Sequence, residues 1–267
     1  MKLTKLAVAL SATVLLAACG GNTTPTDTES PAAPETSASQ SAPADPTTPA
    51  AAPTSDAIVF AAASLNAVFP EIADAKYSFD GSSGLVDQMM GGAPADVFAS
   101  ADQKNMDKAV AEGLIDGDPV MFATNYLVVV TPADNPAGIT GFDASLDGKK
   151  LVICAADVPC GAATLKAAEA NNLTLTPVSE EAKVTDVLGK VTSGEADAGL
   201  VYATDATGAG DAVQVFDVPG AKEDPNTYWI AKVKDAPNGA AADAVIAAIT
   251  GADGQAALAG YGFGPAQ

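Results

Sequence analysis

Short apolar runs alternate with helix-like segments along the chain from residue 56 onward. Strands are predicted over residues 57–62, 77–79, 96–99, 126–131, 150–155, 198–202 and 212–217. Helices are predicted over 65–75, 85–90, 105–115, 162–172, 184–191, 241–250 and 253–261. The strand runs are nearly continuous in apolar residues, which is typical of sheets covered on both faces. Strands alternating with helices indicate parallel βαβ units, and hence an α/β protein.

The beginning of the chain shows a different pattern. Lysines precede an apolar stretch over residues 6–18, which is short for a bilayer span and ends in small residues, as a signal peptide does. Leu16-Ala17-Ala18-Cys19 resembles the lipobox of bacterial lipoproteins. We therefore expect a signal peptide over 1–18 and a mature N-terminus lipidated on Cys19. The alternative is an ordinary signal peptide with an incidental Cys.

Residues 20–55 are rich in Pro, Thr, Ser and Ala and contain no Ile, Leu, Val, Met or aromatic residue. Such a segment cannot bury enough apolar surface to offset the entropy lost on ordering. We expect residues 19–55 to be a disordered tether between the lipid and a folded part that begins at Asp56.

The charge of the chain excludes several classes of function. The chain has 33 acidic and 13 basic residues, which gives a formal net charge of −20. All 13 basic residues are Lys. This balance argues against nucleic acid or anionic lipid as a partner. Because His and Arg are absent, there is no His-ligated metal, no Ser-His pair and no bidentate Arg clamp for an anion. Acidic pairs are too common here to indicate a glycosidase, so we expect no enzyme.

Small and polar residues follow several predicted strands, at the beginnings of helices or at a strand end. The candidates are Ser64, Ser82, Ser83, Cys160, Val184 and Tyr202. Ligands of open α/β sheets collect at this end of the strands, and helix N-termini bind anions without formal charge. Each residue alone has a plainer explanation, since Ser is a common N-cap and Tyr often packs at a strand end. These positions together favour an anion site, but they do not name the anion.

Several segments are similar to one known family. Quoted in chain order, they are Phe60–Leu65 (FAAASL), Gly81–Asp102 (GSSGLVDQMMGGAPADVFASAD), Asp157–Gly161 (DVPCG), Gly199–Ala206 (GLVYATDA) and Gly260–Phe263 (GYGF). They resemble the periplasmic molybdate-binding proteins of ABC importers, and the resemblance extends over residues 57–264. The AAASL stretch of the first segment and the GAPADVFASAD stretch of the second are specific to that family, whereas the GSSG and VPCG turns are much less so.

The resemblance implies a two-lobed α/β fold of the type II periplasmic-binding-protein class, with the ligand cleft between the lobes. We expect lobe 1 to comprise residues 56–133 and 218–267, and lobe 2 residues 134–217. Ser64 and Ser82 would donate hydrogen bonds to an oxyanion from lobe 1, with Ser83 as a further candidate.

From lobe 2, the donors would be the backbone N–H groups of Cys160 and Val184 and the hydroxyl of Tyr202. The family often has Ala where Cys160 stands, and a main-chain contact tolerates that difference. Molybdate would be held through these groups, without a direct cation ligand from the protein.

The function implied by the resemblance is capture of molybdate, and of tungstate, outside the cytoplasmic membrane. The expected partners are an ABC permease and its ATPase. We expect no cofactor and no nucleic acid, and we expect the chain to be a monomer that contacts the membrane only through its lipid. One alternative is a binding protein for sulfate or another tetrahedral oxyanion. Another is an anchored α/β hydrolase, although no His is available as a base near Ser64 or Ser82.

Cys154 and Cys160 lie six residues apart, just before and within one of the proposed anion-binding turns. In a chain exported to an oxidising compartment, we hypothesise a disulfide between them. The alternative is a pair of reduced, half-buried thiols.

Overall fold

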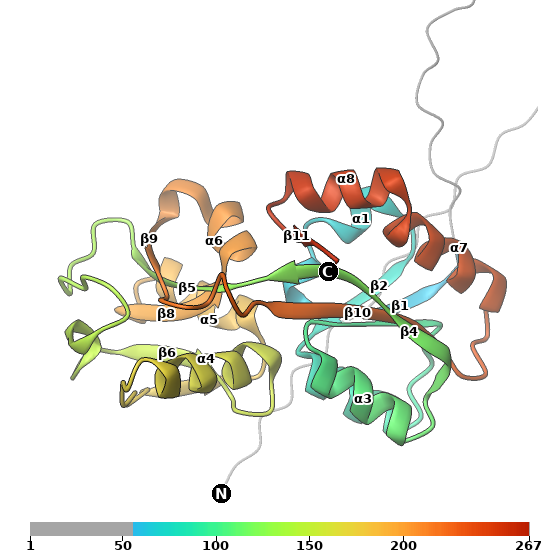
Figure 1. Ribbon diagram of the computed structural model, residues 1–267, viewed down its shortest axis with the longest axis horizontal. Coiled ribbons are helices and arrows are strands. Elements are labelled where there is room, and N and C mark those ends of the chain that lie inside the picture. Colours follow the sequence, from blue (N-terminus) through green and yellow to red (C-terminus); the bar gives the residue numbers. More distant parts are fainter. Residues whose placement is uncertain (1–55, 267) are drawn as a thin grey trace, which may run out of the picture. The chain divides into compact units, whose positions relative to one another are not determined.

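The computed structural model describes residues 56–266, which form two mixed β-sheets with helices packed against them (Figure 1). The expected signal peptide, Cys19 and the tether lie outside the described residues. Among the residues that are described, no helix is both long enough and apolar enough to cross a bilayer.

The first sheet has the strand order β11-β4-β10-β3-β1-β2. Its strands are β1 (Ile58–Ala62), β2 (Lys76–Asp80), β3 (Val97–Ser100), β4 (Ile115–Asn125), β10 (Asn226–Val233) and β11 (Gly264–Pro265). Strand β1 pairs in parallel with β2 and β3, whereas β10 and β4 are antiparallel to their neighbours. Its helices are the 3-10 helix η1 (Ala63–Leu65), α1 (Phe69–Ile72), α2 (Ser82–Met90), α3 (Gln103–Ala111), α7 (Gly239–Thr250) and α8 (Ala252–Gly260).

The second sheet has the order β7-β6-β8-β5-β9. Its strands are β5 (Leu127–Pro132), β6 (Leu151–Cys154), β7 (Ser179–Glu181), β8 (Ala198–Tyr202) and β9 (Val213–Asp217). Its helices are α4 (Pro159–Ala170), α5 (Val184–Thr192) and α6 (Ala203–Ala209), with the 3-10 helices η2 (Ala144–Leu146) and η3 (Gly210–Ala212). We call each sheet with its helices a lobe, lobe 1 for the first and lobe 2 for the second.

The chain passes between the sheets twice (Figure 1). It leaves lobe 1 between β4 and β5, where only Tyr126 separates the two strands, and it returns between β9 and β10. The expected boundary after residue 133 therefore lies too far along the chain. Strand β5 already belongs to lobe 2, because it pairs with β8 and β9 of the second sheet. The expected return at residue 218 coincides with the end of β9. An apolar strand such as β5 carries no sign of which sheet it joins, so its sequence could not fix this boundary.

The first sheet is buried on both faces, which explains its nearly continuous apolar strands. Val59 and Ala61 on β1 belong to a large core cluster that continues into lobe 2. Phe60, between them, points to the other face and packs in a second cluster with Leu85 of α2 and Met106 of α3.

Two helix predictions were too long, and four strands (β4, β7, β10 and β11) and helix α6 were missed. The helix expected over 65–75 is divided into η1 and the short α1. The helix expected over 105–115 stops at Ala111, because Gly113 takes a φ of 69° and the chain turns into β4. Strands β4 and β10 have only short apolar runs, VMFA at 120–123 and YWIA at 228–231, flanked by polar residues. Strands β7 and β11 are only three and two residues long.

Cys154 ends β6 and Cys160 is the second residue of α4, and their sulfur atoms lie 2.01 Å apart. Both side chains are buried, at 1% and 2% exposure. This is the arrangement expected of a disulfide that ties a strand end to the first turn of the following helix.

We predict that the pair is bonded and that replacing both cysteines by Ala lowers the free energy of unfolding by about 2 kcal/mol, the value for so short a loop. Urea denaturation of the protein with and without reducing agent measures this. Reducing agent should destabilise the native protein and leave the double variant unchanged. Equal stability of the native protein in both conditions would contradict the prediction.

Candidate functional site

Five of the six candidate residues line one small cavity between the lobes. Its lining consists of Ala62, Ala63, Ser64, Asp80, Gly81, Ser82 and Ala101 from lobe 1, and Val158, Pro159, Cys160, Val184 and Tyr202 from lobe 2. The cavity volume is about 10 Å³, which is room for about one water molecule. Ser83 is buried, at 6% exposure, but does not line the cavity.

In lobe 1 the candidates stand where two neighbouring parallel strands end. Strands β1 and β2 pair in register up to Ala62 and Asp80. Ser64 follows β1 within η1, and Ser82 follows β2 as the first residue of α2. Because parallel strands end at the same edge of a sheet, residues 18 positions apart in sequence come together there.

In lobe 2 the candidates come from two helix N-termini and one strand end. Pro159 is the first residue of α4 and has no N–H, so Cys160 supplies the first backbone donor of that helix. Val184 is the first residue of α5, and Tyr202 ends β8. The N–H groups of a first helical turn have no acceptor within the helix, which leaves them for a ligand or solvent.

Two hydroxyl groups of the site are oriented by the bonds that they accept. The backbone N–H of Ala101 donates to Ser82 Oγ at 3.1 Å. Asn226 Nδ2 donates to the Tyr202 hydroxyl oxygen at 2.9 Å, and the same Nδ2 donates to the carbonyl oxygen of Ala101 at 3.1 Å. The carbonyl partner fixes which end of the Asn226 amide is the donor. Ser82 and Tyr202 therefore keep their own hydroxyl hydrogens for a further acceptor.

The remaining hydroxyl, that of Ser64, lies 2.8 Å from the hydroxyl of Tyr228, and either group can donate. Both tyrosines at the site are buried. Burial raises the pKa of Tyr202 well above its usual value, with smaller contributions from Tyr228 and two nearby carboxylates. The phenol is therefore protonated, and a hydrogen-bond donor, throughout the physiological pH range.

The cavity lining contains one ionisable carboxylate and no cation. Asp80 Oδ1 accepts the N–H of Gly81 at 2.9 Å, and Asp80 Oδ2 accepts Gln88 Nε2 at 3.1 Å. Within residues 56–266, no group of three or more His, Cys, Asp or Glu side chains is placed to hold a metal cation. Apart from Asp80, the polar groups that line the cavity are neutral hydrogen-bond donors, which suit an acceptor-rich ligand.

The sequence did not reveal several residues that build the site. Asn226 and Tyr228 both lie on β10, a strand that the apolar pattern did not predict, and they reach residues more than 20 positions away. Asp80 carried no signal in a chain with 33 acidic residues.

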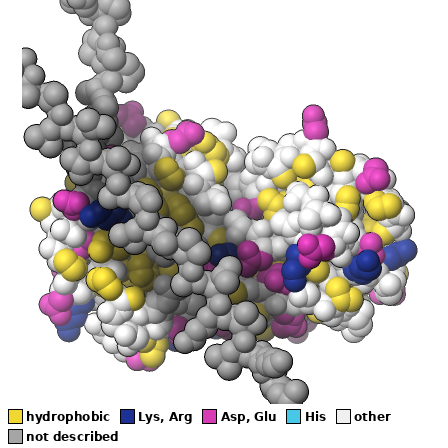
Figure 2. Space-filling model, turned by 180° about the vertical axis from the view of Figure 1, so that it is seen from behind, with side chains coloured by type: hydrophobic (Ala, Val, Ile, Leu, Met, Phe, Trp, Pro, Cys, Tyr) yellow, Lys and Arg dark blue, Asp and Glu magenta, His cyan; other side chains and the backbone are white. Residues whose placement is uncertain are grey.

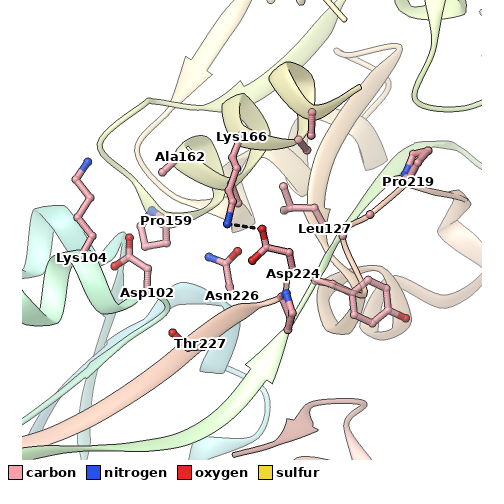
Figure 3. Close-up of a pocket in the computed structure, with 17 residues that line it drawn as sticks. Asp102, Lys104, Leu127, Pro159, Ala162, Lys166, Pro219, Asp224, Asn226 and Thr227 are labelled. Atoms are coloured by element: carbon pink, nitrogen blue, oxygen red, sulfur yellow. Dashed lines mark ion pairs between the residues drawn. The ribbon is translucent and has the colours of Figure 1, made fainter. Parts of the chain in front are cut away.

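A larger cavity, of about 440 Å³, shares Pro159 with the lining of the small one and is also lined by Asn226 (Figure 3). It lies between α4, the start of α3 and the connection from β9 to β10, and Lys166 and Asp224 form an ion pair in it. Most of its α4 side is Ala. It brings together none of the hydroxyl and helix N-terminal candidates, so the small cavity is the better candidate site.

The surface offers no further anion-attracting feature in the view of Figure 2. On the described part of that face, basic side chains stand near acidic ones rather than in a patch of their own. Among the described residues of this face, no basic patch is present that would attract an anion.

Two α/β lobes joined by crossing segments, with a donor-lined cavity between them, define the class of solute-binding proteins. A family model described as bacterial extracellular solute-binding protein matches residues 57–264. The chain belongs to this family, whose members act outside the cytoplasm.

Individual relatives agree with this assignment. A molybdate-binding protein, ModA, of Mycobacterium tuberculosis (strain H37Rv) is 41% identical over 259 residues, covering 93% of this chain and 92% of the relative. The substrate-binding domain of a molybdenum ABC transporter from Clostridium difficile, described as putative, has a TM-score of 0.57 at 28% identity, covering 79% of this chain and 99% of that one. The periplasmic molybdate-binding protein of Azotobacter vinelandii has a TM-score of 0.70 at 20% identity, covering 79% and 100%, which shows the shared fold.

A partly buried carboxylate, that of Asp205, lies next to Tyr202. Asp205, the third residue of α6, accepts the backbone N–H of Tyr202 at 3.1 Å. Burial raises the pKa of this carboxyl from its ordinary value to about 7, although the bond from Tyr202 acts in the other direction. Below that pH the folded protein holds a proton that the unfolded chain releases near pH 4.

Because the folded state binds this proton more tightly, the free energy of unfolding should fall as the pH rises from about 4 to about 7. Asp205→Asn keeps an oxygen acceptor for Tyr202 and should flatten that part of the profile. Denaturant unfolding at several pH values measures it. As a control, Asp143→Asn removes an exposed carboxyl whose pKa is lowered by Ser145, and it should leave the slope between pH 5 and 7 unchanged. An unaltered slope in Asp205→Asn would contradict the prediction.

Proposed function

We propose that this protein binds molybdate, and tungstate, outside the cytoplasmic membrane and delivers it to an ABC importer. The observation that carries the proposal is the convergence of neutral donors from both lobes on one cavity. The name of a relative that is 41% identical over 93% of this chain, a molybdate-binding protein, supports the choice of ligand.

We assign the contacts as follows. Ser64 and Ser82 donate through their hydroxyls, Cys160 and Val184 through backbone N–H groups, and Tyr202 through its phenol. Ser83 remains a further candidate that would have to turn toward the ligand, since it does not line the cavity.

Neutral donors suit a tetrahedral dianion that is fully deprotonated at pH 7. Such an anion presents only acceptors, so every donor in the site finds a partner. Hydrogen phosphate would bring its own proton to a site made of donors, and an unmatched polar group of this kind costs about 1–3 kcal/mol. Protonation therefore separates molybdate, tungstate and sulfate from phosphate, and cavity size separates the first two from sulfate.

Binding requires the lobes to move. A cavity with room for about one water molecule does not admit a five-atom anion unless its walls separate. The segments between β4 and β5 and between β9 and β10 are the places where such a hinge motion would occur. Closure would then bring the donors of the two lobes onto opposite sides of the ligand.

The location and partners follow from the same proposal. Cys19 would carry the lipid, and residues 20–55 would connect it to the binding part of a monomeric chain. The permease and its ATPase would receive the anion, and the protein itself would catalyse no reaction and need no cofactor. The disulfide between Cys154 and Cys160 would hold the turn that presents the Cys160 N–H.

Calorimetric titration with molybdate, tungstate, sulfate and phosphate tests the ligand. We expect tight binding of molybdate and tungstate, much weaker binding of sulfate, and none of phosphate. Tight binding of sulfate, with no heat of binding for molybdate or tungstate, would show that the ligand is another oxyanion. The absence of a heat of binding with all four anions would contradict the proposal as a whole.

Replacing Ser82 by Ala should weaken molybdate binding by about 1–3 kcal/mol, because one buried donor is lost while the anion still loses its water there. Tyr202→Phe should have an effect of similar size. The exposed Ser193, at the end of α5, provides the control: Ser193→Ala should leave the affinity unchanged. An unchanged affinity in Ser82→Ala would remove that hydroxyl from the site.

A further inference from the structure

The two lobes meet beside the cavity through two pairs of adjacent residues. Asp80 ends β2 in lobe 1 and Gly81 follows it, while Ala182 and Lys183 precede α5 in lobe 2. We call these four residues the rim contact. Asp80 and Gly81 line the cavity, while the side chains of Asp80 and Lys183 are about one third exposed, so the contact lies where the cavity approaches the solvent.

Gly81 lies so close to lobe 2 that no side chain fits there. A Cβ atom on Gly81 would lie 2.1 Å from the carbonyl oxygen of Ala182, and this oxygen belongs to the backbone. The φ and ψ of Gly81 are −61° and 138°, which any residue adopts. Lobe 1 therefore does not need glycine for its own conformation. The glycine is required by the approach of lobe 2.

An ion pair lies next to this backbone contact. Lys183 Nζ is 4.0 Å from Asp80 Oδ1, and the exposed fractions of the two side chains are 32% and 33%. The N–H of Gly81 and the amide of Gln88 hold the Asp80 carboxylate in place from within lobe 1. The pair thus joins a fixed carboxylate of one lobe to a lysine of the other.

The rim contact is covalently next to the proposed donors of both lobes. Gly81 directly precedes Ser82, and Lys183 directly precedes Val184. Any movement that separates Gly81 from Ala182 therefore also moves the Ser82 hydroxyl and the Val184 N–H apart. The separation across the rim contact and the spacing of these two donors are therefore coupled.

We propose that the rim contact sets the lifetime of the bound oxyanion, with Gly81 permitting full closure and the Asp80–Lys183 pair slowing reopening. This inference rests on the proposed function, because it concerns release of that ligand. The four residues are positioning residues, since they act through Ser82 and Val184.

The first test is Gly81→Ala in the full chain. We expect molybdate to dissociate about tenfold faster or more, since each 1.4 kcal/mol lost from closure is a factor of ten. Release of radiolabelled molybdate into excess tungstate gives the rate, and small-angle scattering with molybdate present should give a larger radius of gyration than for the native protein. Gly189→Ala is the matched control, because a Cβ there meets open space on the neighbouring helix α5.

The second test separates the ion pair from simple charge effects on the ligand. If only attraction to the dianion mattered, Asp80→Asn would slow release and Lys183→Gln would speed it. The rim contact predicts that both variants release molybdate about two- to fivefold faster, the range for a partly exposed pair, with high salt removing the difference. Lys108→Gln breaks an ion pair with Asp87 inside lobe 1 and should change nothing.

The outcomes distinguish the two proposals. If the native protein binds none of the oxyanions, the proposed function is wrong and the inference falls with it. If the native protein binds molybdate and Gly81→Ala releases it at the native rate, the rim contact is wrong and the proposed function stands. Slower release from Asp80→Asn would overturn the role of the ion pair.

Discussion

The direction of a few hydrogen bonds determines what the cleft of this protein can hold. Ser82 Oγ and the Tyr202 hydroxyl each accept a bond from the protein, so their hydrogens remain for a ligand. Cys160 and Val184 add N–H groups from helix N-termini. A site built in this way favours a ligand with acceptors only and opposes one that carries a proton. The chain has no Arg or His and, among the described residues, no Lys lines the cavity, so these dipoles are the groups there that can hold an anion.

This arrangement depends on both lobes and on the strand that returns between them. Strand β10 is paired in the first sheet, yet its Asn226 contacts Tyr202 of the second. Its Tyr228 contacts Ser64, and the ring of Tyr228 packs edge-on against that of Tyr202. One strand thereby sets the position of hydroxyl groups on both sides of the cavity. A movement of the lobes and a change in the donor geometry are consequently coupled.

The sequence predicted the α/β class, and it singled out five residues that line one cavity. It could do so because the ends of parallel strands and the starts of helices are local features, visible in Ser64, Ser82 and Val184. The strand that supplies Asn226 was missed because its pairing depends on distant partners. The need for glycine at position 81 was equally invisible, since the atom that excludes a side chain belongs to Ala182, about a hundred residues away.

The position of the anion itself tests the account most directly. A crystal of the protein grown with molybdate, measured on both sides of the molybdenum absorption edge, locates the metal atom by its anomalous scattering. The account predicts one strong peak between the lobes, with oxygens within hydrogen-bond distance of Ser82 Oγ, the Tyr202 hydroxyl and the N–H groups of Cys160 and Val184. A peak outside this cavity, for example in the larger one beside Lys166, would contradict it.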